Sequence, residues 1–186
     1  MQSDKTYEYI FEAEYCDLDD CGGPGWSGSF SGPQIIRQDV DNASNGYYVS
    51  FLYSEGNNLT FEFTSDVAEK GDLVLRLSTI VPDMWLASEE VWNIVINGTV
   101  IDYGDVYLTG TGGLNEVAPF EDAIVIKDFD ILAGTNKIEL ITVNSVPPAV
   151  TGINMTGTAP EVDCIKVYAD TAVLDWDPLE ENTWYI

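Results

Sequence analysis

Short apolar runs separated by turn residues dominate the chain. Leu59, Phe61 and Phe63 alternate with polar residues, as expected for a strand with one buried face and one wet face. No convincing long amphipathic helix appears. Similar runs, rich in β-branched and aromatic residues and bounded by turn formers, predict strands at 6–14, 47–53, 58–63, 73–80, 92–97, 106–108, 123–129, 137–143 and 162–168. Many short antiparallel strands predict an all-β fold, a β-sandwich (jelly roll) of two antiparallel sheets.

Three segments depart from this pattern. Residues 17–43 are expected to form an extended loop with a short strand at 34–38, and residues 145–159 a second long loop. The tail at 175–184 is either a last edge strand or the start of a linker. Because no internal repeat or interior linker is visible, a single domain over 1–186 is expected.

The composition of the chain excludes some classes of function and favours others. The chain has 186 residues, 45% of them hydrophobic, which is enough for a full core in one domain. Its net charge of −25 argues against nucleic acid and anionic membranes as partners, because like charges repel, and favours cations or neutral ligands. No apolar stretch is long enough to span a bilayer, and the N-terminus lacks a secretion signal, so a secreted chain would already be trimmed.

Three acids indicate a metal site. Glu12 and Glu14 alternate with apolar residues, so a strand would place both carboxylates on one face. Asp163 lies in another short apolar run near the far end of the chain. If the two terminal strands pair, three hard oxygen ligands converge, which is a donor set that suits Ca²⁺. The alternative is that Glu12 and Glu14 are solvated acids of an edge strand.

The cysteines give a weaker signal. Cys16 and Cys21 are close enough in sequence for a disulfide, or they are two unpaired thiols. Cys164 lies within the last predicted core strand and is expected to be a small buried apolar residue. The chain contains no histidine, which argues against a zinc site.

Catalysis has little support in the sequence. The absence of histidine excludes a serine–histidine–acid triad, and the glycines at 110, 112 and 113 lack the lysine and helix of a phosphate-binding loop. A glycosidase needs only two carboxylates, which 32 acidic residues readily supply. A small sandwich offers little loop for a catalytic cleft, so a binding module is expected rather than an enzyme.

Six motifs in order resemble a known family. The similarity extends over about 7–170, and the motifs are FEAE at 11–14, ASNGYYV at 43–49, GDLVLRLS at 71–78, IVING at 94–98, LAGTNKIEL at 132–140 and VDCI at 162–165. Together they resemble the carbohydrate-binding modules of families 35 and 6. Those modules are calcium-containing β-jelly rolls attached to secreted enzymes that attack plant and microbial polysaccharides.

The resemblance implies roles for individual residues. It assigns Glu12, Glu14 and Asp163 to a structural Ca²⁺, completed by a backbone carbonyl near Ser44. Asp17, Asp19 and Asp20 form either a solvated loop or a second calcium site of the kind that contacts ligand hydroxyls in some related modules.

The sugar site is expected on loops at one end of the sandwich, where an aromatic platform faces the apolar side of a sugar ring. Trp85 is the first candidate, because it follows a Pro-Asp turn. Phe120 stands where the family usually carries a tryptophan, and Trp92 could line the same cleft or pack in the core. Further candidates are Trp26, Tyr48 and Asn154, with Asn144 as the rival amide.

These observations predict a monomeric, secreted, non-catalytic carbohydrate-binding module. Its partners would be a polysaccharide or oligosaccharide, from plant cell-wall hemicellulose or pectin, and a catalytic domain in the same parent protein. Two alternative functions remain open. The chain could be an adhesive or structural sandwich domain whose partner is a protein, or a small calcium-dependent polysaccharide hydrolase or lyase.

Overall fold

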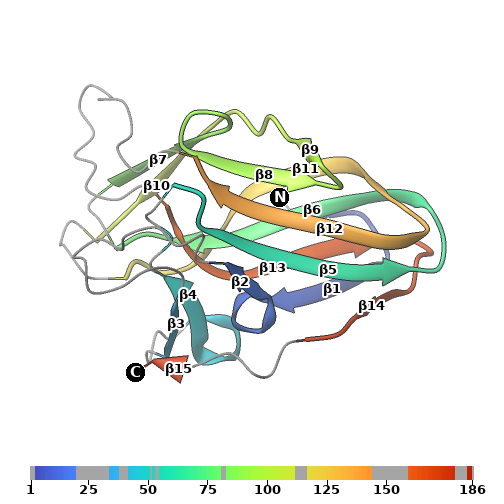
Figure 1. Ribbon diagram of the computed structural model, residues 1–186, viewed down its shortest axis with the longest axis horizontal. Coiled ribbons are helices and arrows are strands. Elements are labelled where there is room, and N and C mark those ends of the chain that lie inside the picture. The colour runs from blue at the N-terminus through green and yellow to red at the C-terminus, as the bar shows by residue number, and fades with distance from the viewer. Residues whose placement is uncertain are drawn as a thin grey trace.

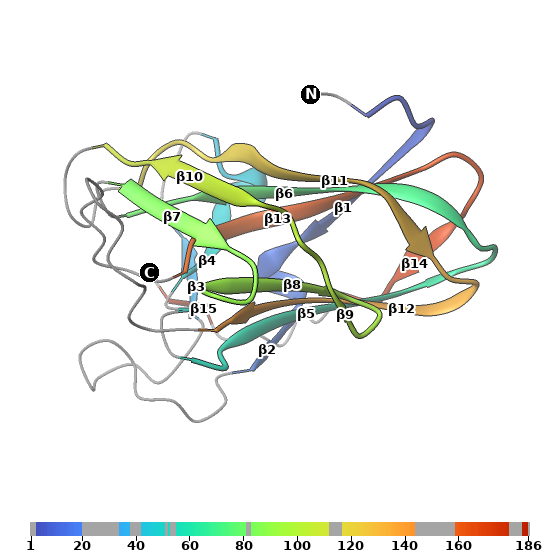
Figure 2. The same cartoon turned by 90° about the horizontal axis from the view of Figure 1, so that it is seen from above.

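The computed structural model describes residues 3–19, 34–37, 42–50, 52, 55–80, 83–111, 117–143, 159–178 and 184–185. Two stacked β-sheets form the body of the molecule, and Figure 2 shows them edge-on as an upper and a lower layer. Among the described residues, no helix is long and apolar enough to cross a membrane. The described helices are single 3₁₀ turns, η1 (Ala13–Tyr15) and η2 (Ser44–Gly46).

The first sheet has the strand order β11-β6-β13-β4-β3-β15, with β1 also paired to β13 (Figure 1). Its pairs are antiparallel except the parallel β3–β15 pair. Its strands are β1 (Tyr7–Glu12), β3 (Gln34–Arg37), β4 (Tyr47–Ser50), β6 (Glu69–Ser78), β11 (Glu121–Ile131), β13 (Glu161–Ala169) and β15 (Trp184–Tyr185).

The second sheet has the order β14-β5-β12-β8-β9, with β2 also paired to β5. Its strands are β2 (Asp17–Asp19), β5 (Asn58–Ser65), β8 (Trp92–Ile96), β9 (Thr99–Val100), β12 (Gly134–Thr142) and β14 (Leu174–Trp176). A separate two-stranded ribbon consists of β7 (Asp83–Ala87) and β10 (Asp105–Thr109). The predicted β-sandwich of antiparallel sheets is thus confirmed, and the tail contributes an edge strand, β14.

The core lies between the two sheets and follows the predicted alternation. Leu59, Phe61 and Phe63 of β5 are buried, while the residues between them are partly or fully exposed. Phe11 of β1 packs its ring against Phe63, with ring centroids 5.2 Å apart. Burial of each such side chain contributes about 1.5–3 kcal/mol. The contact between Phe11 and Phe63 joins the first strand to the opposite sheet and so fixes the start of the chain.

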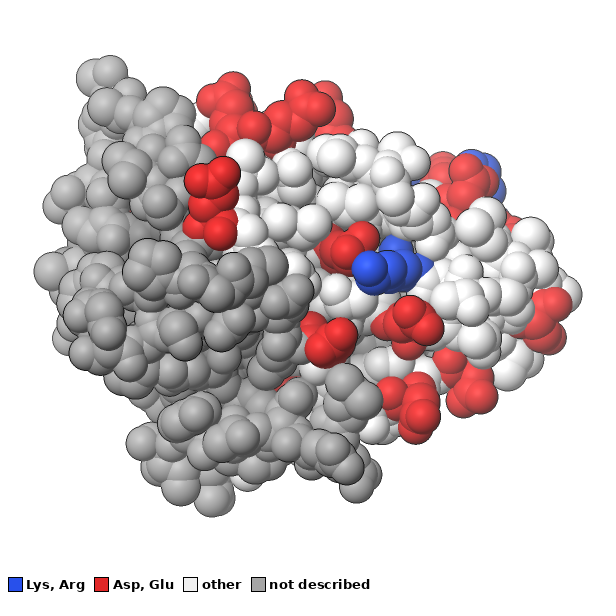
Figure 3. All heavy atoms as spheres, viewed as in Figure 1, with Lys and Arg blue, Asp and Glu red and all other residues white. Residues whose placement is uncertain are grey.

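Charge on the described surface is predominantly negative. Figure 3 shows acidic side chains dispersed over the described part of one face, with basic side chains sparse. Several basic residues are in ion pairs, such as Lys137 with Glu139 at 2.8 Å and Lys70 with Asp130 at 2.6 Å. The surface therefore has the polarity that the composition indicates, without a basic patch for an anionic polymer among the described residues.

Candidate functional site

The predicted metal ligands meet where the first and last long strands pair. β1 and β13 are antiparallel, and Glu12 stands opposite Cys164. Asp163 lies at a register shift between Val162 and Cys164, and such irregularities often redirect a side chain. The ligand atoms of Glu12, Asp163 and Cys164 lie within 4.8 Å of one another. The expected pairing of the terminal strands therefore joins acids that are 151 residues apart in sequence, from position 12 to position 163.

Glu14, the third predicted ligand, lies near these acids but belongs to a different element. The prediction of one strand over 6–14 was wrong at its end, because β1 stops at Glu12 and Ala13–Tyr15 form a 3₁₀ turn. Glu14 is fully buried in this turn, and the Asn45 side chain donates a hydrogen bond of 3.0 Å to its Oε1. We refer to Glu12, Glu14 and Asp163 as the acid cluster. Glu14 is not among the residues whose ligand atoms converge within 4.8 Å, although its carboxylate is close enough to Glu12 and Asp163 to interact with both electrostatically.

Ser44 binds two members of the acid cluster. Its backbone N–H donates to Asp163 Oδ1 at 2.8 Å, and its Oγ donates to Glu12 Oε1 at 2.7 Å. Its carbonyl accepts a hydrogen bond from the backbone N–H of Tyr47. The sequence prediction used a carbonyl near Ser44 as a metal ligand, whereas the described contacts of Ser44 with the acids are made by its N–H and hydroxyl.

Arg76 is a member of this site that the sequence reasoning missed. Its Nε donates to Asp163 Oδ2 at 2.7 Å, and its Nη2 donates to the Asn42 carbonyl at 2.6 Å. The Asn42 side chain in turn donates to the Phe120 carbonyl at 2.8 Å and accepts from the Phe120 N–H at 3.1 Å. The available signal was an arginine between Leu75 and Leu77, within the otherwise apolar run 73–77 of β6 (Glu69–Ser78).

Burial controls the electrostatics of the acid cluster. Loss of water around the carboxyls raises the pKa of Glu14 to about 7 and that of Asp163 to about 6, and it raises the pKa of Glu12 as well. Ser44 partly offsets this effect at Glu12, and Ser44 and Arg76 do so at Asp163. The protein thus holds three carboxylates where their ionised forms are poorly solvated.

The acid cluster fits a hard cation. Glu12 Oε2 is buried and accepts no hydrogen bond, so an ion beside it would supply a missing partner. The neighbouring Cys164 offers a soft sulfur, which is a poor ligand for a hard cation. The remaining donors are carboxylate and hydroxyl oxygens, which suit Ca²⁺ better than zinc or copper.

The structure gives the described candidate sugar-binding aromatics buried positions. The predicted turn around Trp85 is instead part of strand β7, and the indole is 8% exposed, with Nε1 donating to Asp105 Oδ1 at 3.2 Å. Trp92 is fully buried in the core, the second of the two roles that the sequence left open. Phe120 and Tyr48 pack against each other, with ring centroids 5.3 Å apart.

Other candidates fall outside the described residues, namely Trp26, Asn144, Asn154, Asp20 and Cys21. The predicted sugar contacts and the predicted Cys16–Cys21 disulfide therefore stay predictions. So does the second calcium site at Asp17, Asp19 and Asp20.

Glu161 is a further buried carboxyl, which the sequence did not single out. It lies at the start of β13 and is 1% exposed. Ser50 donates a hydrogen bond of 2.9 Å to its Oε1, whereas its Oε2 has no hydrogen-bond partner. Burial raises its pKa to about 8. This carboxyl is separate from the acid cluster. It lies at the end of the sheet where Tyr48 and Phe120 pack.

Comparison with known proteins finds its matches among solved structures. No family model matches the chain, and no curated protein matches it in sequence. The family 35 carbohydrate-binding module (CBM35) from Cellvibrio japonicus Abf62 is 15% identical, with a TM-score of 0.58 over 93% of this chain and 99% of that module. A CBM35 in complex with a glucuronic acid-containing disaccharide is 15% identical, with a TM-score of 0.50 over 88% of this chain and 95% of that one.

A third match is part of a larger enzyme. The Podospora anserina GH26-CBM35 β-(1,4)-mannanase is 19% identical, with a TM-score of 0.54, and the match covers 88% of this chain but 28% of the mannanase chain. At these identities the likeness concerns the fold. The chain therefore has the β-sandwich fold of the family 35 carbohydrate-binding modules.

Proposed function

We propose that this chain is a non-catalytic carbohydrate-binding module that holds a secreted polysaccharide-degrading enzyme against plant cell-wall hemicellulose or pectin. The observation that carries the proposal is the fold, which matches family 35 modules along nearly their full length. One such match is joined to a mannanase, which supports an attached catalytic domain in the parent protein. The absence of histidine from the chain also removes the commonest general base of hydrolytic enzymes.

The acid cluster is proposed to hold a structural Ca²⁺. Glu12 and Asp163 would supply carboxylate oxygens from the two paired strands, and Glu14 would supply one from the 3₁₀ turn. When bound, the ion would neutralise the buried carboxylates and cross-link the strands that bear them. Ser44 and Arg76 orient the oxygens through hydrogen bonds of 2.7–2.8 Å. This arrangement supports a stabilising role for the metal rather than direct contact with sugar.

A glycan array with and without Ca²⁺ tests the proposal. The chain, purified in calcium and separately in chelator, is applied to arrayed xylans, mannans, galactans and pectins at 25 °C. Binding to at least one polysaccharide is expected, with no reducing sugar released during prolonged incubation. A chain that bound no glycan but captured a basic protein would instead be an adhesive domain. Release of oligosaccharides would make it a hydrolase or lyase.

A further inference from the structure

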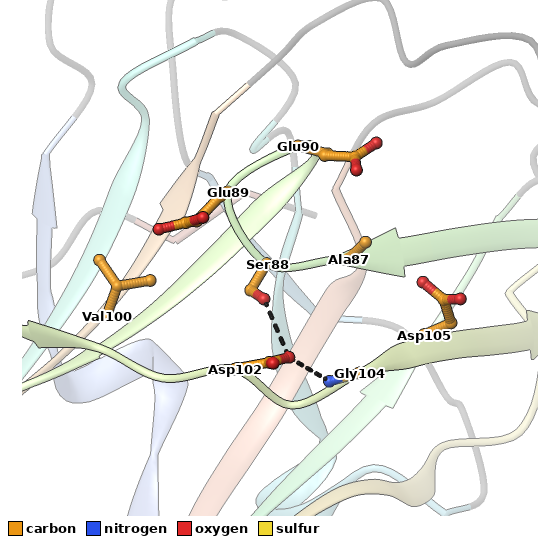
Figure 4. Close-up of a pocket in the computed structure, with 8 residues that line it drawn as sticks. All are labelled: Ala87, Ser88, Glu89, Glu90, Val100, Asp102, Gly104 and Asp105. Carbon is orange, nitrogen blue, oxygen red and sulfur yellow. Dashed lines mark hydrogen bonds between the residues drawn. The ribbon is translucent and has the colours of Figure 1, made fainter.

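A polar hollow lies beside the β7–β10 ribbon, away from the acid cluster. We call it the side pocket; its volume is about 330 Å³, and it is lined by Ala87, Ser88, Glu89, Glu90, Val100, Asp102, Gly104 and Asp105. These residues come from the end of β7, the turn into β8, the end of β9 and the segment leading into β10 (Figure 4). Its size is within the range of small-ligand sites.

The walls of the side pocket are joined by the β7–β10 pairing and ordered by local hydrogen bonds. Asp102 Oδ1 accepts from the Gly104 N–H at 3.0 Å and, more weakly, from Ser88 Oγ at 3.5 Å, so it links the two walls (Figure 4). The Glu89 N–H donates to Asn93 Oδ1 at 2.6 Å. The turn is also closed by a bond of 3.1 Å from the Val91 N–H to the Ala87 carbonyl. A preformed pocket binds a ligand without a large ordering cost.

The acids of the side pocket do not form a cation cage. Glu89, Glu90, Asp102 and Asp105 are exposed, and Figure 4 shows the carboxylates of Glu89 and Glu90 directed away from each other. Among the described residues, Glu12, Asp163 and Cys164 are the group whose metal-ligand atoms converge within 4.8 Å. Dispersed carboxylates instead offer separate acceptors, each able to receive hydrogen bonds from hydroxyl groups.

An exposed aromatic ring stands beside the side pocket. Tyr107 is 55% exposed and lies directly opposite Trp85 across the ribbon, as Asp105 lies opposite Ala87. Residues two apart on a strand share a face, so Tyr107 is on the same face as the pocket residue Asp105, about 7 Å further along. Residues directly opposite each other in an antiparallel pair share a face, so the Trp85 indole lies on this face too, where it is buried and donates to Asp105 Oδ1. Tyr107 thus offers an exposed aromatic ring on the same face of the ribbon as the pocket residues Ala87 and Asp105.

From this geometry we infer that the side pocket and Tyr107 form a binding site for an uncharged sugar unit. Tyr107 stacks on the apolar face of the pyranose ring, and the carboxylates of Asp102 and Asp105 and the Ser88 hydroxyl engage its hydroxyl groups. The lining includes no lysine or arginine, so an acidic sugar would be repelled. The inference rests on the proposed carbohydrate-binding function and adds a site and a class of ligand to it.

Titration with neutral oligosaccharides tests the inference. Cellohexaose, xylohexaose, mannohexaose and a glucuronic acid-substituted xylo-oligosaccharide are added to the ¹⁵N-labelled chain in calcium, and amide shifts and affinities are measured. At least one neutral hexaose is expected to shift amides at 88–90 and 102–107, and the acidic sugar is not. Tyr107→Ala is expected to weaken this binding about tenfold, whereas Tyr107→Phe retains it. Tyr7→Ala is the matched control, since Tyr7 is 53% exposed on β1 and should change nothing.

The outcomes separate the two proposals. If a hexaose bound with shifts elsewhere and Tyr107→Ala bound it equally well, the side-pocket inference would be overturned and the proposed function would stand. If none of these sugars and no arrayed polysaccharide bound, both would fail. If Ca²⁺ alone shifted the amides of 102–105, the pocket would be a cation site and the inference would be wrong. Because Tyr107 is exposed, its variants should keep the wild-type thermal midpoint, which excludes unfolding as the cause of lost binding.

Discussion

Two acidic regions of this molecule differ in the burial and spacing of their carboxylates. In the acid cluster, Glu14 and Asp163 are fully buried and Glu12 has an oxygen without a hydrogen-bond partner. In the side pocket, Asp102 and Asp105 are exposed and accept hydrogen bonds from the Gly104 N–H and the Trp85 indole, respectively. In the two proposals, burial and convergence of the carboxylates, rather than the number of acids, distinguish a cation site from a site for hydroxyl groups. Buried converging carboxylates call for a cation, and exposed dispersed ones can receive hydroxyl groups.

The largest effect is expected from removing Asp163. Asp163→Ala leaves the partly buried Arg76 and the Ser44 N–H without their acceptor, so the free energy of unfolding should fall by about 3–5 kcal/mol. Urea unfolding measures this change. The control is Asp122→Ala, whose side chain is 42% exposed and pairs with Arg76 and Lys166 at the surface. It should cost less than about 1 kcal/mol. Equal losses for the two variants would contradict the contrast.

Calcium removal should have the next largest effect. At about one hundred times its dissociation constant, Ca²⁺ adds about 2.7 kcal/mol of stability. For a chain of this size the thermal midpoint should then rise by roughly 5–10 °C over the chelated protein. Glu12→Gln should abolish most of this increment, because Glu12 Oε2 is the buried oxygen that lacks a partner. Glu8→Gln, on an exposed position of the same strand, should retain it. Calorimetry with and without chelator measures this difference in thermal midpoint. An unchanged midpoint would contradict the proposed structural Ca²⁺.

A smaller loss is expected at Asn42, which connects the acid cluster to Phe120. Asn42→Ala deletes both hydrogen bonds to the Phe120 backbone and should cost about 1–2 kcal/mol. Ser88→Ala removes a long, exposed bond of 3.5 Å in the side pocket, so its cost should be under about 0.5 kcal/mol. Chemical denaturation of both variants tests whether the polar contacts of the two regions differ in this way. A larger loss for Ser88→Ala would reverse the comparison.

The smallest effect concerns the backbone of the side pocket. Glu89 has a φ of 65°, a left-handed conformation that glycine adopts more easily. Glu89→Gly should therefore stabilise the chain by about 0.5–1 kcal/mol. Glu90→Gly, at the next residue, relieves no such conformation and should be neutral or destabilising. Thermal unfolding distinguishes the pair, and a destabilised Glu89→Gly would mean that its side chain contributes more to the turn than the backbone costs.

Particular residues show which features of the structure could be predicted from the sequence and which could not. The alternation of Leu59, Phe61 and Phe63 was sufficient to predict β5 and its buried face, because a strand repeats every two residues. The same rule failed at Glu14, since nothing local signals that β1 ends in a 3₁₀ turn. It also failed at Trp85, where Pro82 and Asp83 resemble a turn. β7 pairs with β10, about 20 residues further along, and that pairing gives the segment its strand conformation.

The sequence by itself determined the all-β class, most of the strands and the two acids that converge, Glu12 and Asp163, because these depend on local periodicity and on side-chain chemistry. It also indicated that the first and last long strands would meet. Only the tertiary structure decided which groups surround the acids and which aromatic rings are exposed. Arg76 reaches Asp163 across 87 residues, and Tyr107 stays exposed while Trp85 opposite is buried. These outcomes depend on long-range packing and on desolvation, which no short stretch of sequence contains.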